Sequence, residues 1–324
     1  HLERIVDMSH GLQLHRWTFI VVLPVMLVVT SCSRTEPPVL PATTMRHRPI
    51  EPGDPRLLSH EWYQFHGPNL DNVSTEPELL RVWPAGGPER IWTVQGVGIG
   101  FSSVAIADGF IYTAGNRGGH TTITAIGLDG EVRWQKPNGA SWTDSYEGTR
   151  GTPTIDGDRL YHESPLGRVT CMDAQTGQEL WSRNILNEFG SRNIQWALAE
   201  SLVIDGDHVI CTPGGPRTCI VALSKATGET VWQSPSAEGD LAGYASPTLA
   251  QLGEVRMILQ MTAKALVGVN AENGDLLLRV EHDTKYDVNA MRPIFKDGYV
   301  FVSSGYGTGS VMYKLNLDGG RVMA

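Results

Sequence analysis

The sequence predicts an all-β fold, a β-propeller of four-stranded antiparallel blades. A sequence pattern returns about every 47 residues, and each repeat contains short alternating segments separated by Asp-Gly or Thr-Gly turns. Glycine accounts for 36 of the 324 residues, about 11% against a usual 7%, which indicates many tight turns. Within the repeat, no segment with a helical period is longer than one turn.

Two markers define the repeat. The first is a turn with a glycine, followed four residues later by tryptophan in most repeats. Its glycines stand 47, 51 and 46 residues apart, at Gly130, Gly177, Gly228 and Gly274. The second is an apolar or proline position before each strand pair, at steps of 49, 49, 45 and 46 residues, at Val104, Pro153, Leu202, Pro247 and Pro293. Two markers that share one period identify a true internal repeat.

Alternating apolar and polar residues predict four short strands in each repeat. In the second complete repeat we expect them at Thr152–Ile155, Arg159–Glu163, Arg168–Asp173 and Glu179–Arg183. The glycines of the turns supply the positive φ that hairpins need. A sheet of this size cannot bury both faces alone, so we expect the repeats to stack around a common axis.

The repeated tryptophans are expected to anchor each blade to the next one. They are Trp134, Trp181 and Trp232, and Trp92 holds the same place before the first repeat, which we interpret as the outer strand of a preceding blade. An indole buried between sheets removes roughly 150–250 Å² from water, which corresponds to about 4–6 kcal/mol as an upper bound. Leu278 replaces the fourth tryptophan, so we expect that junction to be weaker.

The N-terminal part predicts export and lipid attachment. Residues 18–29 form a largely apolar stretch, too short to span a bilayer but suited to a secretory signal. Small residues then precede Cys32 in a pattern that resembles a bacterial lipobox; the alternative is an ordinary cleaved signal with a chance cysteine. We expect residues 1–7 to be upstream or non-native residues that precede a lipoprotein signal peptide in 8–31. A proline-rich tether in 32–58 and an incomplete propeller in 59–324 are expected to follow.

The markers together form the paired signature P-x-x-x-x-D-G-x-x-Y and A-x-D-x-x-T-G-x-x-x-W, which residues 172–181 and 223–232 match best. This signature resembles the repeat of the quinoprotein-like β-propellers, the family named for pyrroloquinoline quinone, and residues 62–94 resemble its lipoprotein-type members linked to outer-membrane assembly. The resemblance implies an eight-bladed ring. Because the chain holds five repeats and Trp92, we expect five to six blades in an open arc of such a ring, from a C-terminally truncated sequence.

The resemblance implies a non-catalytic scaffold for protein interaction outside the cytoplasm, with a role in outer-membrane protein assembly. Its expected partners are other proteins of the cell envelope, and it would reach a membrane, the outer one in particular, only through its lipid anchor. A formal charge of −9 and the lack of any basic run argue against a nucleic-acid partner.

Two alternatives stay open, an enzyme such as a quinone-dependent dehydrogenase and a propeller that binds a glycan or small ligand. The family's dehydrogenases carry two adjacent cysteines and a calcium ion held by carboxylates and an amide. Here Cys32, Cys171, Cys211 and Cys219 are not adjacent, and the acidic residues and histidines lack metal-ligand spacing. We therefore expect no cofactor, metal or catalytic residue, with pyrroloquinoline quinone and Ca²⁺ as the alternative.

Candidate site residues cluster in the segments that join an outer strand to the next inner strand. In a propeller these segments gather at the mouth of the central channel, where aromatic and arginine side chains suit recognition of a partner or ligand. The candidates are Trp142, Asp144, Tyr146, Glu147, Arg150, Trp196, Glu200, Tyr244 and Arg292. The alternative is that these side chains only bond to loop backbone and cover the face of the ring.

Cys211 and Cys219 flank a glycine-rich link between two predicted strands. An oxidising compartment would allow a disulfide between them if their Cβ atoms approach to about 3.5–4.5 Å. The alternative, which we favour, is a pair of small buried residues.

Overall fold

The structure is a computed structural model that describes residues 61–76, 79–318 and 321–324. All of them belong to one unit of the chain, Ile50–Ala324. The predicted signal peptide, lipidation site at Cys32 and proline-rich tether lie outside the described residues. Within the described part of the chain, no helix has the length and apolar character needed to cross a membrane.

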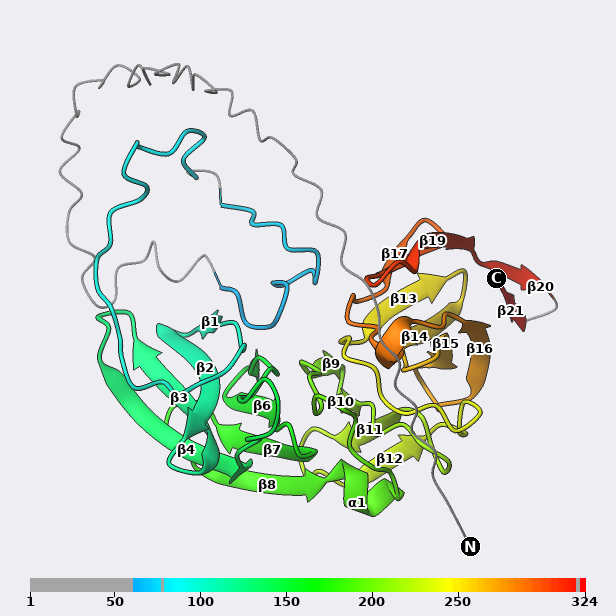
Figure 1. The fold of residues 1–324 in the computed structure, drawn as a ribbon, viewed down its shortest axis with the longest axis horizontal. Helices are drawn as coiled ribbons and strands as arrows, with labels where there is room; N and C mark the ends of the chain where they lie inside the picture. Colours follow the sequence, from blue (N-terminus) through cyan, green and yellow to red (C-terminus); the bar gives the residue numbers. More distant parts are fainter. Residues whose placement is uncertain (1–60, 77–78, 319–320) are drawn as a thin grey trace, which may run out of the picture. The chain divides into compact units, whose positions relative to one another are not determined.

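The chain folds into antiparallel sheets, each a meander of consecutive strands, which we call blades 1 to 5 (Figure 1). Blade 1 contains β1 (Ala105–Ala107), β2 (Phe110–Arg117), β3 (His120–Gly127) and β4 (Val132–Ala140). Blade 2 contains β5 (Thr154–Asp156), β6 (Arg159–Glu163), β7 (Arg168–Asp173) and β8 (Glu179–Asn184). Blade 3 contains β9 (Val203–Asp205), β10 (His208–Cys211), β11 (Val221–Ser224) and β12 (Thr230–Gln233).

The last two blades continue the series. Blade 4 contains β13 (Thr248–Leu252), β14 (Val255–Met261), β15 (Ala265–Asn270) and β16 (Leu276–Glu281). Blade 5 has three strands, β17 (Ile294–Lys296), β18 (Tyr299–Ser304) and β19 (Gly309–Lys314), followed by a separate pair, β20 (Asn316–Asp318) and β21 (Arg321–Met323). The described helices are α1 (Ile185–Phe189) and the single 3-10 turn η1 (Lys285–Asp287). The predicted all-β architecture of four-stranded blades is thus confirmed.

The strands predicted for the second repeat agree closely with blade 2. Strands β6 and β7 begin and end at the predicted residues, whereas β5 begins at Thr154 rather than Thr152. The reason is that Thr152 bonds sideways to the neighbouring blade, since its backbone N–H donates to Ser201 Oγ at 3.0 Å.

Hydrogen bonds at one repeated position link the blades near their first strands. The backbone N–H of Ser103 donates to Thr152 Oγ1 at 3.0 Å, that of Thr152 donates to Ser201 Oγ, and that of Ser201 donates to Ser246 Oγ at 2.9 Å. Each of these residues precedes the first strand of its blade. The first strands of blades 1 and 2, 2 and 3, and 4 and 5 also contact each other, which sets the blades side by side in chain order.

Each junction between successive blades has its own hydrophobic core. Tyr112 and Trp134 of blade 1 pack with Leu160 and Met172 of blade 2 in one buried cluster. Equivalent clusters join blades 2 and 3, blades 3 and 4, and blades 4 and 5. Apolar side chains are therefore buried between sheets rather than inside any single sheet, as expected for units too thin to form a core alone.

The repeated indoles lie against the turn glycine of the following blade. A Cβ atom added to Gly177 would stand 2.7 Å from the ring of Trp134, and one added to Gly228 would stand 2.6 Å from the ring of Trp181. Both glycines have positive φ, 67° and 75°. Only glycine combines this backbone conformation with room for an aromatic ring at van der Waals distance.

Hydrogen bonds reinforce the first two of these junctions. Trp134 Nε1 donates to the carbonyl of Ala174 at 3.0 Å, and Trp181 Nε1 donates to that of Lys225 at 3.1 Å. Tyr112 of β2 and Tyr161 of β6 donate to the same two carbonyls, at 3.2 and 3.1 Å. At the third junction, Trp232 Nε1 has no hydrogen-bond partner among the described residues, so this indole contributes through packing alone.

Trp92 differs from the other repeated tryptophans. It contacts Gly130 in the same manner and donates from Nε1 to Leu128 O at 2.9 Å. However, the structure assigns no strand to residues 79–98, and the Trp92 side chain is 37% exposed whereas Trp134, Trp181 and Trp232 are 8–9% exposed. The interpretation of Trp92 as part of an outer strand is therefore wrong, because its segment pairs with no sheet in the described residues.

Two alanine substitutions separate the indole contact from the cost of positive φ. Gly228→Ala places a methyl group against Trp181, whereas Gly206→Ala, at φ 58°, meets no atom within 4 Å. Both variants bear the left-handed backbone cost of about 1–2 kcal/mol. We expect Gly228→Ala to lose about 1–3 kcal/mol more from the free energy of unfolding in urea, because the ring and turn must move apart. Equal losses would contradict the contact.

Candidate functional site

A cavity of about 920 Å³, which we call the aromatic pocket, is bounded by the connecting segments of several blades. These are the β4–β5, β8–β9, β12–β13 and β16–β17 connections and the β18–β19 turn. Residues 65–72, which precede blade 1, supply another part of the wall. The lining includes Phe65, His66, Phe101, Tyr146, Arg150, Trp196, Tyr244, Arg292 and Tyr306.

Five of the nine candidate residues line this pocket. Tyr146 and Arg150 come from the β4–β5 connection, Trp196 from β8–β9, Tyr244 from β12–β13, and Arg292 from β16–β17. They are far apart in sequence. The stacking of blades therefore gathers one or two side chains from each of four connections around a single cavity.

The other four candidates lie elsewhere. Trp142 Nε1 donates to Ser145 O at 3.2 Å, and Asp144 accepts from the Ser145 backbone N–H at 2.7 Å, so both bond to their own loop. Glu147 is exposed outside the lining, and Glu200 is buried.

Five aromatic rings form a continuous series, which we call the aromatic row. The ring centroid of Trp196 lies 6.5 Å from that of Tyr146, 5.9 Å from that of Tyr244 and 6.5 Å from that of Tyr286. Tyr286 in turn lies 5.3 Å from Tyr306, edge to face. Such arrangements stabilise aromatic pairs by about 0.5–1.5 kcal/mol beyond the area that they bury.

Three tyrosines of the row hold an unusual backbone conformation. Tyr146, Tyr286 and Tyr306 have φ of 56°, 73° and 56°. Positive φ in a bulky residue costs about 1–3 kcal/mol and persists only where the surroundings enforce it, commonly at functional sites. Sequence reasoning missed Tyr286 and Tyr306. The available signals were the position of Tyr286 in a connection rich in charged residues and that of Tyr306 in a glycine-rich turn.

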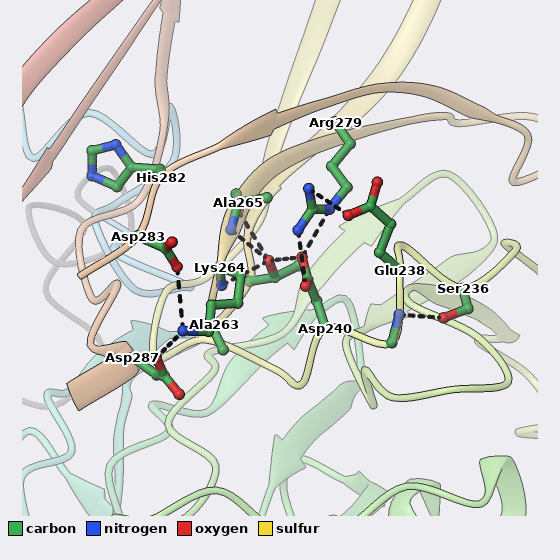
Figure 2. A network of polar contacts seen from close by, with 12 residues as sticks. Ser236, Glu238, Asp240, Ala263, Lys264, Ala265, Arg279, His282, Asp283 and Asp287 are labelled. Carbon is green, nitrogen blue, oxygen red and sulfur yellow. Dashed lines mark hydrogen bonds and ion pairs between the residues drawn. The ribbon is translucent and has the colours of Figure 1, made fainter. Parts of the chain in front are cut away.

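A polar network holds the loops that carry two of these rings (Figure 2). Arg279 of β16 donates to both carboxylate oxygens of Asp240 at 3.0 and 3.1 Å, and Thr262 Oγ1 donates to Asp240 at 2.9 Å. Because Asp240 belongs to the β12–β13 connection, these bonds fix the segment that leads to Tyr244. An arginine–carboxylate pair with two parallel bonds gives geometric precision as well as energy.

The same network extends to the 3-10 turn. Lys264 of the β14–β15 turn pairs with Asp287 at 2.7 Å and with Asp283 at 3.2 Å (Figure 2). These two hydrogen-bonded carboxylates raise the pKa of Lys264. Asp287 directly follows Tyr286, so the ion pair with Lys264 holds the 3-10 turn that contains Tyr286. The rigid β14–β15 hairpin thereby positions rings from two different connections.

A pair of buried carboxyl groups lies near the pocket. Glu163 ends β6 and Glu200 precedes β9, and the backbone carbonyls of both lie within 3 Å of where a Cβ of Gly151 would stand. Gln260 Nε2 donates to Glu200 Oε2 at 3.2 Å, while Glu163 Oε1 and Oε2 and Glu200 Oε1 have no hydrogen-bond partner among the described residues. Sequence reasoning missed Glu163, which reads as an ordinary strand residue.

Burial controls the charge of this region. Loss of hydration raises the pKa of Glu200 to about 8. Burial also raises the pKa of Glu163, with the neighbouring Glu200 as an additional cause. A pKa of about 8 keeps the Glu200 carboxyl mostly protonated at neutral pH. Burial also lowers the pKa of Arg292 to about 10, which leaves this guanidinium fully charged at neutral pH.

The cysteines of the described residues are free thiols. Cys211 is buried in the cluster between blades 2 and 3, whereas Cys219 is buried in the cluster between blades 3 and 4. They therefore face opposite sides of blade 3, and the disulfide considered from the sequence does not form. The described residues contain no group of three or more histidine, cysteine or acidic side chains placed to hold a metal ion.

The stacked four-stranded sheets, with an indole at each of the first three junctions, define a β-propeller. The family model described as outer membrane protein assembly factor BamB matches residues 73–217 and 119–323. The chain therefore belongs to the BamB family of quinoprotein-like propellers, which confirms the family expected from the repeat signature.

Individual relatives show the same likeness. Outer membrane protein assembly factor BamB of Kangiella koreensis is 26% identical over 211 residues, which cover 64% of this chain and 49% of the relative. The chain thus spans about half the length of that relative. The crystal structure of BamB from Moraxella catarrhalis is similar with 20% identity and a TM-score of 0.45, over 68% of this chain and 60% of that chain. A europium-containing methanol dehydrogenase is similar with 14% identity and a TM-score of 0.47, over 63% and 52%.

The buried carboxyl pair predicts a pH-dependent stability. The ordinary pKa of Glu200 is 4.5 and its folded value is about 8, so between these values the native state holds a proton that the unfolded state has released. The contribution of Glu200 to the free energy of unfolding is complete below pH 4.5 and falls by about 1.4 kcal/mol per pH unit as pH rises towards 8. We expect wild-type stability in urea to fall more steeply from pH 5 to 8 than that of Glu200→Gln.

Glu254→Gln, at an exposed position, is the matched control and is expected to keep the wild-type slope. Parallel curves for wild type and Glu200→Gln would show that Glu200 is already ionised in the folded protein.

Proposed function

We propose that this chain is a non-catalytic scaffold of the cell envelope that takes part in outer-membrane protein assembly. Membership of the BamB family supports the process, since the family is described as an outer membrane protein assembly factor. The lipobox-like residues before Cys32 support a lipid anchor and a place on the periplasmic side of a membrane, the outer membrane in particular.

The observation that carries the proposal is the aromatic pocket together with the aromatic row, which holds three tyrosines at positive φ. Aromatic and arginine side chains on a rigid framework are the residue types that dominate binding energy in protein interfaces. Here Thr262 and Lys264 of the β14–β15 hairpin bind Asp240 and Asp287, which fixes two of the ring-bearing segments. A pre-ordered surface of this kind loses little conformational entropy when a partner binds.

The composition of the lining favours recognition over catalysis. Its described residues include one carboxylate, that of Asp71, and this side chain bonds to its own loop at Val73 N, at 2.9 Å. The two carboxyls with raised pKa, Glu163 and Glu200, are buried and do not line the pocket. The other polar side chains of the lining are guanidinium, phenol, imidazole, amide and hydroxyl groups, which suit binding.

Site-specific photo-crosslinking tests the proposed function. Replacement of Tyr306 by a photo-reactive phenylalanine in the full-length protein in its native cells places the probe on the pocket wall. We expect a crosslinked product whose partner, identified by mass spectrometry, is a component of outer-membrane protein assembly. Tyr299 is a matched control, since it is 42% exposed on β18 but does not line the pocket. Equal products at both positions, or a partner outside the envelope, would contradict the proposal.

A further inference from the structure

The aromatic pocket carries positive charge that is not balanced within the described residues. Arg150 donates to two backbone carbonyls of its own loop, at 2.7 and 3.0 Å. Arg292 donates from Nε to Thr248 Oγ1 at 3.0 Å and from Nη2 to Pro247 O. All of these acceptors are neutral, and neither guanidinium forms an ion pair with a carboxylate of the described residues.

The neighbouring acids do not neutralise these cations. Glu200 is the acid that interacts with Arg292, but its buried carboxyl has a pKa of about 8 and so is mostly protonated at neutral pH. Asp71, in the wall, is exposed and bonds to its own loop. The pocket is therefore locally positive although the whole chain has a formal charge of −9.

Burying a cation without a counter-charge costs free energy, and binding of an anion beside it offsets that cost. Arg292 is buried and Arg150 is half-buried, so each guanidinium has lost hydration, and this loss lowers the pKa of both. Two arginines from different connections, one partly exposed and one buried, suit a carboxylate, since charge-assisted hydrogen bonds to carboxylates are among the stronger ones in proteins.

The aromatic row indicates what accompanies this carboxylate. Tyr146, Tyr286 and Tyr306 are 70%, 51% and 61% exposed. Tyr286 is not part of the pocket lining, and its ring lies between those of Trp196 and Tyr306, which line the pocket. Exposed rings in series bind successive apolar groups along a chain, whereas a compact molecule would contact only the pocket itself.

We propose that the aromatic pocket binds an extended segment of a partner protein in which carboxylate side chains lie beside aromatic or large apolar side chains. The carboxylate pairs with Arg150 and Arg292, and the apolar side chains pack along the aromatic row. This inference rests on the proposed function and specifies the chemistry of the partner.

The surroundings of Arg150 explain why an arginine suits this role. Its guanidinium carbon lies 5.1 Å from the ring centroid of Phe101, and its two loop hydrogen bonds use only part of its five donors. Stacking on an aromatic ring fixes the plane of the guanidinium and leaves donors for a ligand. Lysine at this position would keep the charge but lose the planar geometry.

Synthetic peptides test the inference directly. Three fluorescent, N-acetylated and C-amidated peptides are compared by anisotropy: one in which Asp and Phe alternate, one in which Asn and Phe alternate, and one in which Asp and Ser alternate. We expect the Asp–Phe peptide to bind at least about 10-fold more tightly than either of the others, because both the charge and the rings contribute. Isophthalate, a small aromatic dicarboxylate, serves as a compact competitor and is expected to compete only weakly.

Variants of the protein locate the charge. Arg150→Gln is expected to weaken binding of the Asp–Phe peptide about 10-fold and to leave the Asn–Phe peptide unchanged. Arg117→Gln, at an exposed position outside the pocket, is the matched control with no expected effect. Arg150→Glu is expected to transfer preference to a peptide in which Lys and Phe alternate, which a loss of folding cannot do.

Equal binding of the Asp–Phe and Asn–Phe peptides would overturn the inference, as would competition by isophthalate at least as strong as by the unlabelled peptide. If the two peptides bind the wild type equally and both fail to bind Trp196→Ala, the pocket still binds extended chains. The proposed scaffold then survives while the charge preference fails. If none of the peptides binds and the Tyr306 crosslink is also absent, both the inference and the proposed function fail.

Discussion

The contact between an indole and the turn glycine of the next blade is the constraint on which the rest of the structure depends. Each blade is a thin sheet that buries its apolar side chains only against a neighbour. The indole of the outermost strand reaches the next blade at a point where a left-handed glycine leaves room for the ring, as between Trp181 and Gly228. This contact sets the spacing of successive sheets and so explains why glycine and tryptophan recur with one period.

Regular stacking has a consequence for function. When sheets repeat at constant spacing, the connections from outer to inner strands fall on the same side of the assembly, and one or two side chains from each reach one cavity. The scaffold supplies rigidity, while the connections, which do not repeat in sequence, supply Arg150, Trp196 and Tyr244. The strained backbone at Tyr286 is held by the ion pair of the adjacent Asp287 with Lys264. The rings of Tyr146, Tyr286 and Tyr306 also pack against other rings of the aromatic row.

Much of this fold could be predicted from the sequence, because period, turn glycines and apolar alternation are local signals that the stacking reinforces. Strands β6 and β7 were located to the residue for this reason. The outer strand predicted at Trp92 is absent from the described residues because a strand needs a partner sheet, whereas the local pattern around Trp92 matches the repeat without one. The pocket could be predicted only in part: connections rich in aromatic residues pointed to it, but the contribution of Tyr306 depends on a turn conformation. The buried carboxyl of Glu163 depends on three-dimensional packing that spacing does not encode.

A double-mutant cycle on Trp181→Leu and Gly228→Ala, followed by urea unfolding, tests the inter-blade contact most directly. If the indole fills the space above the glycine, its removal makes room for the methyl group. The cost of Gly228→Ala then shrinks to that of positive φ in the Trp181→Leu background, and the two changes are non-additive by about 1 kcal/mol or more. Strictly additive costs would show that the ring and the glycine do not depend on each other, which contradicts the account.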